Sequence, residues 1–208
     1  MPKPILSGPI VKPGVRAVLL TAEAIGLELE YKETKLEPKE TIEEYQKRKG
    51  ESRAVILNDA GNIIWESHAI LSYLVSKYGK DDSIYPKDFY QRALVDQILY
   101  LESGFLMPRA RMFLMANTRN LESADKTKKL LTEAIAYFEK ILERTSYLAG
   151  DKLTIADLSA VAIFSNIHNI FPVQVAEYPK LVDWLSRMEN LPYYHKVMDA
   201  GLQWPKQS

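Results

Sequence analysis

The hydrophobic pattern of this 208-residue chain changes its period near residue 80, and no other feature constrains the fold as strongly. Before that point, short strand-like runs alternate with helical segments in the order βαβαββα. From Phe89 onward no strand pattern is present, and long segments repeat with the helical period of about 3.6 residues. A polar stretch around Pro86 separates the two patterns. We therefore expect an α/β domain over residues 1–80, followed by an all-helical domain over residues 88–208.

Local signals place the elements of the first domain. Pro13 suits the first turn of a helix, where its missing N–H donor is not needed. The sequence NDAGN between two apolar runs predicts the turn of a β-hairpin. Ser67 begins the next helix, for which it is the expected cap, and Gly79 ends that helix. The stretches LELEYKETKL and TIEEYQKRK predict a half-buried strand and a short polar helix.

Two further signals belong to the helical domain. Pro108 falls inside a long helical pattern, where it removes a backbone donor and predicts a kink. Thr154, followed three residues later by Asp157, predicts a capping box at the start of another helix.

Composition excludes several classes of function. Lys plus Arg and Asp plus Glu both total 27, so the net charge is zero and no nucleic-acid partner is expected. No apolar run is long enough to span a membrane. The absence of cysteine excludes disulfides and thiolate sites, and the 3 histidines are too dispersed to predict a metal site. We expect a cytoplasmic protein without a metal.

Four segments of the chain resemble one known family. VRAVLLTAEAIGLELEYKETKL, WESHAILSYLVSKYGKDDSIYPKD, LESGFLMPRARM and SYLAGDKLTIADLS are similar to insect cytosolic glutathione transferases of the delta/epsilon type. The resemblance extends over nearly the whole chain. It implies a thioredoxin-like N-terminal domain, an all-helical C-terminal domain and a homodimer. It also implies a glutathione site on the first domain and a hydrophobic substrate site in the cleft between the domains.

The glutathione site that the resemblance implies is matched in part by Glu66 and Ser67. In the family, an acidic residue and a serine at these places hold the γ-glutamyl end of glutathione. The chemistry agrees, because a helix N-terminus favours a carboxylate and Glu66 can pair with an ammonium group. The alternative is that Ser67 only caps its helix, which requires no ligand.

Other positions depart from the family's pattern. Lys12 stands where the resemblance places the catalytic serine, Thr41 and Ser52 where it places two histidines, and Val55 where it places a cis-proline. A cis bond costs about 3–4 kcal/mol before a residue other than proline, so we expect a trans bond before Val55. That change reshapes the loop that pairs with the cysteinyl part of glutathione. A slip of one residue in this alignment would put Ile56 in the place of Val55.

Three interpretations of Lys12 remain open. Its ammonium can donate to the glutathione sulfur, as the family's serine hydroxyl does, and lower the pKa of the thiol. It can instead bind some other anion. The third interpretation is a solvated loop lysine, which is favoured because nothing nearby in the sequence demands a charge.

The hydrophobic site implied by the resemblance draws on the helical domain. Met and aromatic side chains at helical spacing belong more often to a core, so only the resemblance assigns this group to a ligand. The candidates are Phe105, Pro108, Arg111, Met112, Phe113, Phe164, His168 and Phe171.

Two hypotheses about function follow. The first is a protein that binds an apolar small molecule in the interdomain cleft, with glutathione binding and conjugation weak or lost. It is motivated by the departures from the family's pattern at positions 12, 52 and 55. The helical half of the chain follows that pattern more closely. The second is an active detoxifying glutathione transferase that conjugates or isomerises hydrophobic electrophiles, which Glu66, Ser67 and Arg111 favour. The sequence leaves open whether the chain is an enzyme.

Overall fold

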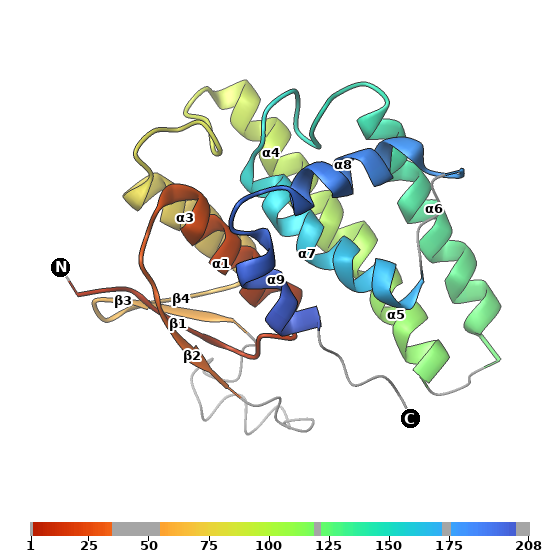
Figure 1. Ribbon diagram of the computed structural model, residues 1–208, viewed down its shortest axis with the longest axis horizontal. Coiled ribbons are helices and arrows are strands. Elements are labelled where there is room, and N and C mark those ends of the chain that lie inside the picture. The colour runs from red at the N-terminus through yellow and green to blue at the C-terminus, as the bar shows by residue number, and fades with distance from the viewer. Residues whose placement is uncertain (1, 35–54, 119–121, 172–175, 203–208) are drawn as a thin grey trace. The chain divides into compact units, whose positions relative to one another are not determined.

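The chain divides into two compact units (Figure 1). The first comprises residues 1–82 together with residues 192–208, and the second comprises residues 83–191. The structure, a computed structural model, describes residues 2–34, 55–118, 122–171 and 176–202. The short helix predicted over TIEEYQKRK lies outside the described residues.

A four-stranded sheet and two helices form most of the first unit. Its elements are β1 (Ile5–Gly8), α1 (Pro13–Ile25), β2 (Glu30–Glu33), β3 (Ile56–Asp59), β4 (Asn62–Trp65) and α3 (Ser67–Tyr78). The strand order is β2-β1-β3-β4, with β1 parallel to β2 and antiparallel to β3, and with β3 antiparallel to β4. This mixed sheet with its helices confirms the thioredoxin-like fold expected for the N-terminal half.

The core of the first unit lies between the sheet and its helices. Leu6 of β1 pairs with Leu57 of β3, and both side chains are fully buried. The helices add Val15 and Val18 from α1 and Leu74 from α3. Figure 1 shows both helices on the same side of the sheet. The period-2 and period-3.6 apolar patterns therefore meet in one core.

The hairpin predicted from NDAGN is confirmed. Ala60 and Gly61 form its turn with φ values of 52° and 92°, as expected for a tight turn that follows the twist of the strands. The side-chain oxygen of Asn58 accepts a hydrogen bond from the Gly61 N–H at 2.9 Å. The turn residues thus set the register of β3 and β4.

A helix not expected from the sequence, α9 (Tyr194–Leu202), also belongs to the first unit. Lys196 forms an ion pair with Glu23 of α1 at 2.6 Å. Arg16 of α1 is fully buried and donates to the carbonyl oxygen of Gly201 at 3.2 Å. The expected second domain, residues 88–208, differs from the observed division because α9 packs on α1.

The described part of the second unit is built from helices. Its elements are α4 (Phe89–Leu101), a π-helix η1 (Glu102–Leu106), α5 (Met107–Thr118), α6 (Ala124–Leu142), α7 (Ile155–Ile170) and α8 (Pro179–Glu189). The rings of Phe138, Phe164 and Trp184 pack edge to face in its core, with successive centroids 5.2 and 5.7 Å apart. These helices confirm the all-helical C-terminal half. None of the described helices is long and apolar enough to cross a membrane.

Pro108 disrupts the long helix that the sequence pattern predicts. α4 ends at Leu101, and 5 residues of π-helix separate it from α5. The Met107 N–H donates to the carbonyl oxygen of Glu102, so the turn before Pro108 is wider than an α-helical turn. Because proline has no N–H to donate and its ring crowds the preceding turn, this widening accommodates it. The sequence predicted a kink at Pro108, and the structure has a π-helical turn just before it.

The predicted capping box at the start of α7 is confirmed. The Thr154 hydroxyl oxygen accepts from the Ala156 N–H at 3.3 Å, and Asp157 accepts from the Thr154 N–H at 2.9 Å. The Asp157 carboxylate also accepts from the Leu148 N–H at 2.9 Å and from the Trp184 indole N–H at 3.0 Å. One local signal thus anchors a loop and a second helix as well as α7.

Candidate functional site

Lys12 lies at the N-cap position of α1, with an extended backbone of φ −79° and ψ 126°. Its N–H donates to the Pro9 carbonyl at 2.9 Å, and its own carbonyl accepts from the Val15 N–H at 3.1 Å. The half-buried side chain makes no capping hydrogen bond. The backbone alone therefore starts the helix, and nothing in the capping of α1 requires a lysine.

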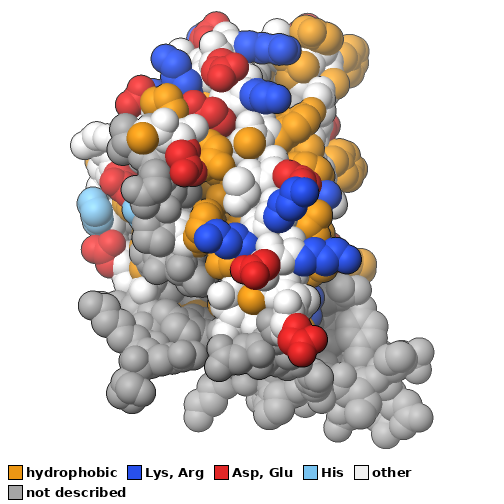
Figure 2. Space-filling view, turned by 90° about the vertical axis from the view of Figure 1, so that its right-hand side faces the viewer, with side chains coloured by type: hydrophobic (Ala, Val, Ile, Leu, Met, Phe, Trp, Pro, Cys, Tyr) orange, Lys and Arg blue, Asp and Glu red, His pale blue; other side chains and the backbone are white. Residues whose placement is uncertain are grey.

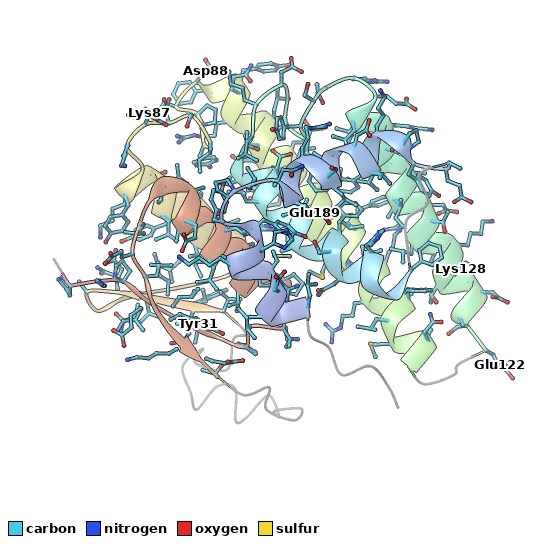
Figure 3. The ribbon with its side chains drawn as sticks, in the orientation of Figure 1. Tyr31, Lys87, Asp88, Glu122, Lys128 and Glu189 are labelled. Carbon is cyan, nitrogen blue, oxygen red and sulfur yellow. The ribbon has the colours of Figure 1, made fainter. Side chains whose placement is uncertain are left out.

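Two side chains that the sequence analysis did not single out hold the loop before Lys12. The Tyr31 hydroxyl donates to the Gly8 carbonyl at 2.8 Å (Figure 3), and the Arg16 guanidinium donates to the Ile10 carbonyl at 2.9 Å. Burial raises the pKa of Tyr31 to about 12 and lowers the pKa of Arg16 to about 10. Both groups therefore keep their protons at neutral pH, and both bonds persist. The sequence holds one indication of these bonds: Arg16 lies inside the apolar run VRAVLL, where a buried charge needs partners.

Glu66 alone connects β4 to α3, and its backbone lies in the left-handed half of φ space, with φ 69° and ψ 116°. Its carbonyl accepts the Ile70 N–H at 3.1 Å, which begins the helix. For a residue other than glycine, a sparsely populated conformation of this kind costs about 1–3 kcal/mol, and such residues cluster at functional sites. Ser67 is the first helical residue and Glu66 occupies the N-cap position, so the expectation that Ser67 caps α3 is wrong.

The starts of α1 and α3 meet at Gly14. A Cβ atom added to Gly14 would lie 3.0 Å from both Cβ and Oγ of Ser67 and 3.2 Å from a methyl carbon of Val55. Contacts this short are tighter than most Cβ contacts in proteins, so a larger residue at position 14 would push Ser67 or Val55 aside and glycine suits the close approach. The structure thereby brings together three sequence-distant places: the residues after Lys12, the residue before β3, and the first residue of α3.

Val55 is buried, with 8% of its surface exposed, directly before β3. Ser52 and Thr41 lie outside the described residues. Ala54 does too, so the trans bond expected before Val55 stays a prediction.

The site at the start of α3 has the polarity of an amino-acid binding site. The exposed carboxylate of Glu66 can attract an ammonium group. The first N–H groups of a helix have no acceptor within it and carry the positive end of its dipole, so they attract a carboxylate. The Ser67 hydroxyl adds a further donor beside them. A ligand that carries an ammonium and a carboxylate on one carbon fits this pair of charges.

The residues predicted for an apolar ligand form two separate ring pairs in the second unit. Phe105 is half-buried and contacts Tyr137, with ring centroids 5.6 Å apart. The Arg109 guanidinium stacks 3.8 Å from the centroid of Phe105 and donates to its carbonyl at 3.0 Å. Phe113 and Phe171 meet edge to face at 5.6 Å. Arg109, which the sequence analysis did not select, is thus the arginine that contacts a predicted ring.

The remaining candidates lie in different surroundings. Pro108, Arg111, Met112 and His168 are exposed. Phe164 is fully buried between core rings of the second unit, so its assignment to a ligand is corrected: it is a core residue. Nothing in the sequence pattern separates it from the exposed members, because they share the same helical spacing.

A polar hollow of about 280 Å³ lies at the end of α6 and beside α8. Arg144, Asp151, Lys180, Asp183 and Arg187 are among its lining residues, and the residues predicted for an apolar ligand are not. Acidic and basic side chains also interleave on the face shown in Figure 2. Among the described residues, no group of three His, Cys, Asp or Glu side chains could hold a metal ion.

Two family models match most of the sequence. The N-terminal domain of glutathione S-transferases matches residues 10–76, and the C-terminal domain matches residues 96–192. The chain belongs to the glutathione S-transferase family. The matched ranges include Lys12, Val55, Glu66 and Ser67.

Insect proteins of the glutathione S-transferase family are similar over nearly the full length. Glutathione S-transferase 1 of Manduca sexta is 37% identical over 198 residues, which cover 91% of this chain and 89% of that protein. An epsilon-class glutathione S-transferase of the housefly Musca domestica has a TM-score of 0.86 and 38% identity, over 97% of this chain and 94% of that one. A glutathione transferase homologue of Drosophila mojavensis, solved with bound glutathione, has a TM-score of 0.86 and 40% identity, over 98% and 94% of the two chains.

Proposed function

We propose that this member of the glutathione S-transferase family binds glutathione through Glu66 and Ser67 and conjugates it only weakly. The backbone of Glu66 is the observation that carries the proposal, because φ is 69° immediately before the helix that meets Gly14. Glycine would hold this backbone without strain. A glutamate at this place is therefore best explained by what its carboxylate binds.

The γ-glutamyl end of glutathione has the chemistry that this site selects. Its ammonium group pairs with the Glu66 carboxylate, and its carboxylate accepts from Ser67 and from the N–H groups of the first turn of α3. Both charges of the ligand lie on one carbon atom, so both partners must be adjacent. The one-residue junction between β4 and α3 provides that adjacency.

Weak conjugation is proposed because Lys12 replaces the hydroxyl donor that the resemblance places beside the glutathione sulfur. Conjugation requires the thiol to lose its proton to solvent; sulfur then attacks an electrophilic carbon, and the leaving group departs with its electron pair. Lysine starts from the same backbone position but carries its charge on a flexible four-carbon stem. Its ammonium therefore reaches past the place of a serine hydroxyl.

A second candidate function is the binding of an apolar small molecule with glutathione binding lost. It is favoured by apolar side chains that α5 exposes, since Met112 is 48% and Met115 is 39% exposed. Methionine is flexible and adapts to ligands of different shape. This function predicts that a fluorescent apolar probe binds with equal affinity in the presence and absence of glutathione.

The family resemblance also leads us to propose a homodimer. α4 exposes Phe89, Tyr90 and Tyr100 with 88%, 69% and 77% of their surfaces, which a second copy would cover.

Calorimetric titration with reduced glutathione near neutral pH tests the main proposal. We expect the wild type to bind, and Ser67→Ala and Glu66→Gln to bind about tenfold to a hundredfold more weakly, because each loses a bond to a charged group. Ser72→Ala is the matched control on the same helix, because the Ser72 hydroxyl donates an exposed hydrogen bond to the Ala69 carbonyl at 3.1 Å, away from the junction. Folded wild type that gives no heat with millimolar glutathione would overturn the proposal and favour the second candidate.

A further inference from the structure

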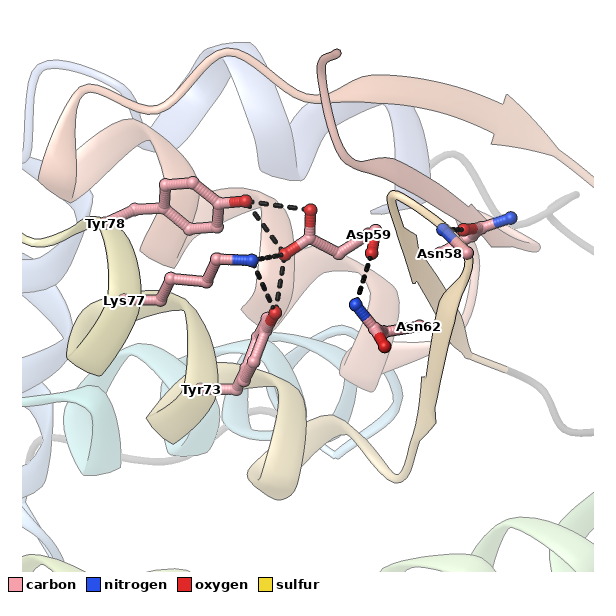
Figure 4. A network of polar contacts seen from close by, with 7 residues as sticks. Asn58, Asp59, Asn62, Tyr73, Lys77 and Tyr78 are labelled. Carbon is pink, nitrogen blue, oxygen red and sulfur yellow. Dashed lines mark hydrogen bonds and ion pairs between the residues drawn. The ribbon is translucent and has the colours of Figure 1, made fainter. Parts of the chain in front are cut away.

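A buried carboxylate joins the hairpin to α3 away from the junction at Glu66. Asp59 is the last residue of β3, and only 2% of its surface is exposed. It accepts hydrogen bonds from the Tyr73 hydroxyl at 2.6 Å, from the Lys77 ammonium at 2.6 Å and from the Tyr78 hydroxyl at 2.8 Å (Figure 4). Lys77 also donates to the Tyr73 hydroxyl at 2.9 Å. One carboxylate therefore holds three side chains of the second half of α3.

The two connections together fix the place where α3 begins. β3 and β4 pair along their whole length, from Ile56 opposite Trp65 to Asp59 opposite Asn62. The helix leaves β4 after one residue, runs for 12 residues or about 18 Å, and is bonded back to β3. Hairpin and helix thus form a closed frame. Any sliding or rotation of α3 would stretch the bonds at Asp59.

This frame accounts for the persistence of the unusual backbone at Glu66. A sparsely populated φ value is kept only where the surrounding structure over-determines it. For Glu66 to relax toward a negative φ value, α3 would have to shift, and the bonds at Asp59 would have to break. That shift would move Ser67 relative to Gly14, beside which its side chain lies.

We propose that Asp59 is a positioning residue for glutathione binding: by holding α3 against the hairpin, it keeps Glu66 and Ser67 where the γ-glutamyl end binds. The inference rests on the proposed function. It goes further by assigning part of the affinity for glutathione to Asp59, a buried residue that does not contact the ligand and lies at the end of β3. Tyr73, Lys77 and Tyr78 share this role as the donors on α3.

Asp59→Asn tests the proposal, because it keeps the shape of the side chain but removes its charge and one acceptor oxygen. We expect the Kd for reduced glutathione to rise by about fivefold or more, measured by calorimetry far below the Tm, where the variant is folded. A purely stabilising role would lower the Tm and leave this Kd unchanged. Asp59→Asn with the wild-type Kd overturns the proposal.

Gly26→Ala is the matched control for loss of stability. Gly26 ends α1 with φ 68°, and within the described part of the chain the atom that an added Cβ would approach is the Lys80 ammonium nitrogen at 3.8 Å. Alanine there strains the backbone and lowers the Tm without touching the bonds at Asp59. We expect its Kd for glutathione to equal that of the wild type. A comparable rise in Kd in this control would overturn the assignment to Asp59.

Tyr73→Phe and Tyr78→Phe keep the proposal testable if Asp59→Asn does not fold. Each removes one hydroxyl donor and leaves the apolar ring, so we expect smaller rises in Kd in the same direction. Wild-type Kd values in both variants would contradict the proposal.

A double-mutant cycle with Glu66→Gly tests the strain itself and needs no ligand. In the wild type, Glu66→Gly is expected to raise the Tm because it relieves the backbone strain. In Asp59→Asn the strain has already relaxed, so Glu66→Gly is expected to lower the Tm, because glycine increases the conformational entropy of the unfolded chain. Additive effects would overturn the coupling. A wild type that fails to bind glutathione defeats the proposed function instead, whereas normal binding with an unaffected Asp59→Asn defeats only the role of Asp59.

Discussion

At the scale of single residues, we propose that Lys12 and Val55 affect different parts of glutathione use, Lys12 the thiol and Val55 the binding of the cysteinyl part. Lys12 starts α1 through its backbone alone, so replacing its side chain leaves the helix intact. We expect Lys12→Ser to raise kcat/KM with an electrophilic aryl halide by less than about tenfold, because Val55 still occupies the place of the cis-proline that the resemblance implies. Robust turnover from this single variant, measured by the release of halide, would contradict the interpretation.

Val55→Pro tests whether the place of the cis-proline also limits conjugation. In combination with Lys12→Ser, it is expected to increase kcat/KM by more than the product of the two single effects, since the hydroxyl donor needs a correctly placed thiol. Independent effects of the two substitutions would mean that the loop does not limit conjugation.

Residues with local signals were predictable, and residues defined by distant contacts were not. Thr154 and Asp157 predict a capping box within four positions of the sequence, and the structure contains both of its hydrogen bonds. The positive φ value of Glu66 depends on how β4 and α3 are held, so no property of glutamate predicts it. The bond from Arg16 to Gly201 joins residues at opposite ends of the chain. The family resemblance therefore suggested Glu66 and Ser67 as candidates, but no local feature of the sequence predicted their geometry.

At the scale of elements, the bond between the hairpin and α3 should be sensitive to acid. Burial raises the pKa of Asp59, but the bonds donated by Lys77, Tyr73 and Tyr78 outweigh it and hold the pKa below its usual value. A lowered folded-state pKa means that the stabilisation is present above the unfolded pKa of about 3.9 and is lost as the pH falls through the lower folded value.

Thermal unfolding between roughly pH 6 and pH 3 measures this effect. We expect the Tm of the wild type to fall more steeply below about pH 4 than the Tm of Asp59→Asn, which has no carboxylate to protonate there. Parallel curves for the two proteins would show that Asp59 does not contribute to the acid sensitivity.

Helices and strands were predictable where residues close together in the sequence determine them. The turn residues Ala60 and Gly61 identify the hairpin within a few positions, and Pro108 identifies the interruption before α5. The form of that interruption, a π-helical turn, depends on the Met107 N–H reaching back to Glu102. α9 was not predicted, although its buried residues follow helical spacing: Tyr194, Val197, Met198 and Gly201. With 9 residues it is a short helix, and α1, on which it packs, lies far away in the sequence.

At the scale of the whole molecule, the change of period near residue 80 was enough to predict two structural classes in one chain. It could not assign residues 192–202 to the first unit, because the helical spacing of apolar residues in α9 does not show which helix that face packs against. Family membership adds the expectation of a homodimer, which one exposed surface makes testable.

The aromatic face of α4 is the surface on which we expect two copies to meet. Phe89 and Tyr100 are 88% and 77% exposed, and their spacing of eleven positions, close to three helical turns, places them on the same side of the helix. Burial of such side chains is favourable, whereas a carboxylate at the centre of the contact would lose its hydration. We therefore expect Tyr100→Asp to shift the protein from dimer to monomer, measured by light scattering during gel filtration. Tyr137→Asp on α6, which replaces a residue that is 48% exposed, is expected to remain dimeric. A wild type that is monomeric at every concentration, or a dimer unchanged by Tyr100→Asp, would exclude this face as the contact.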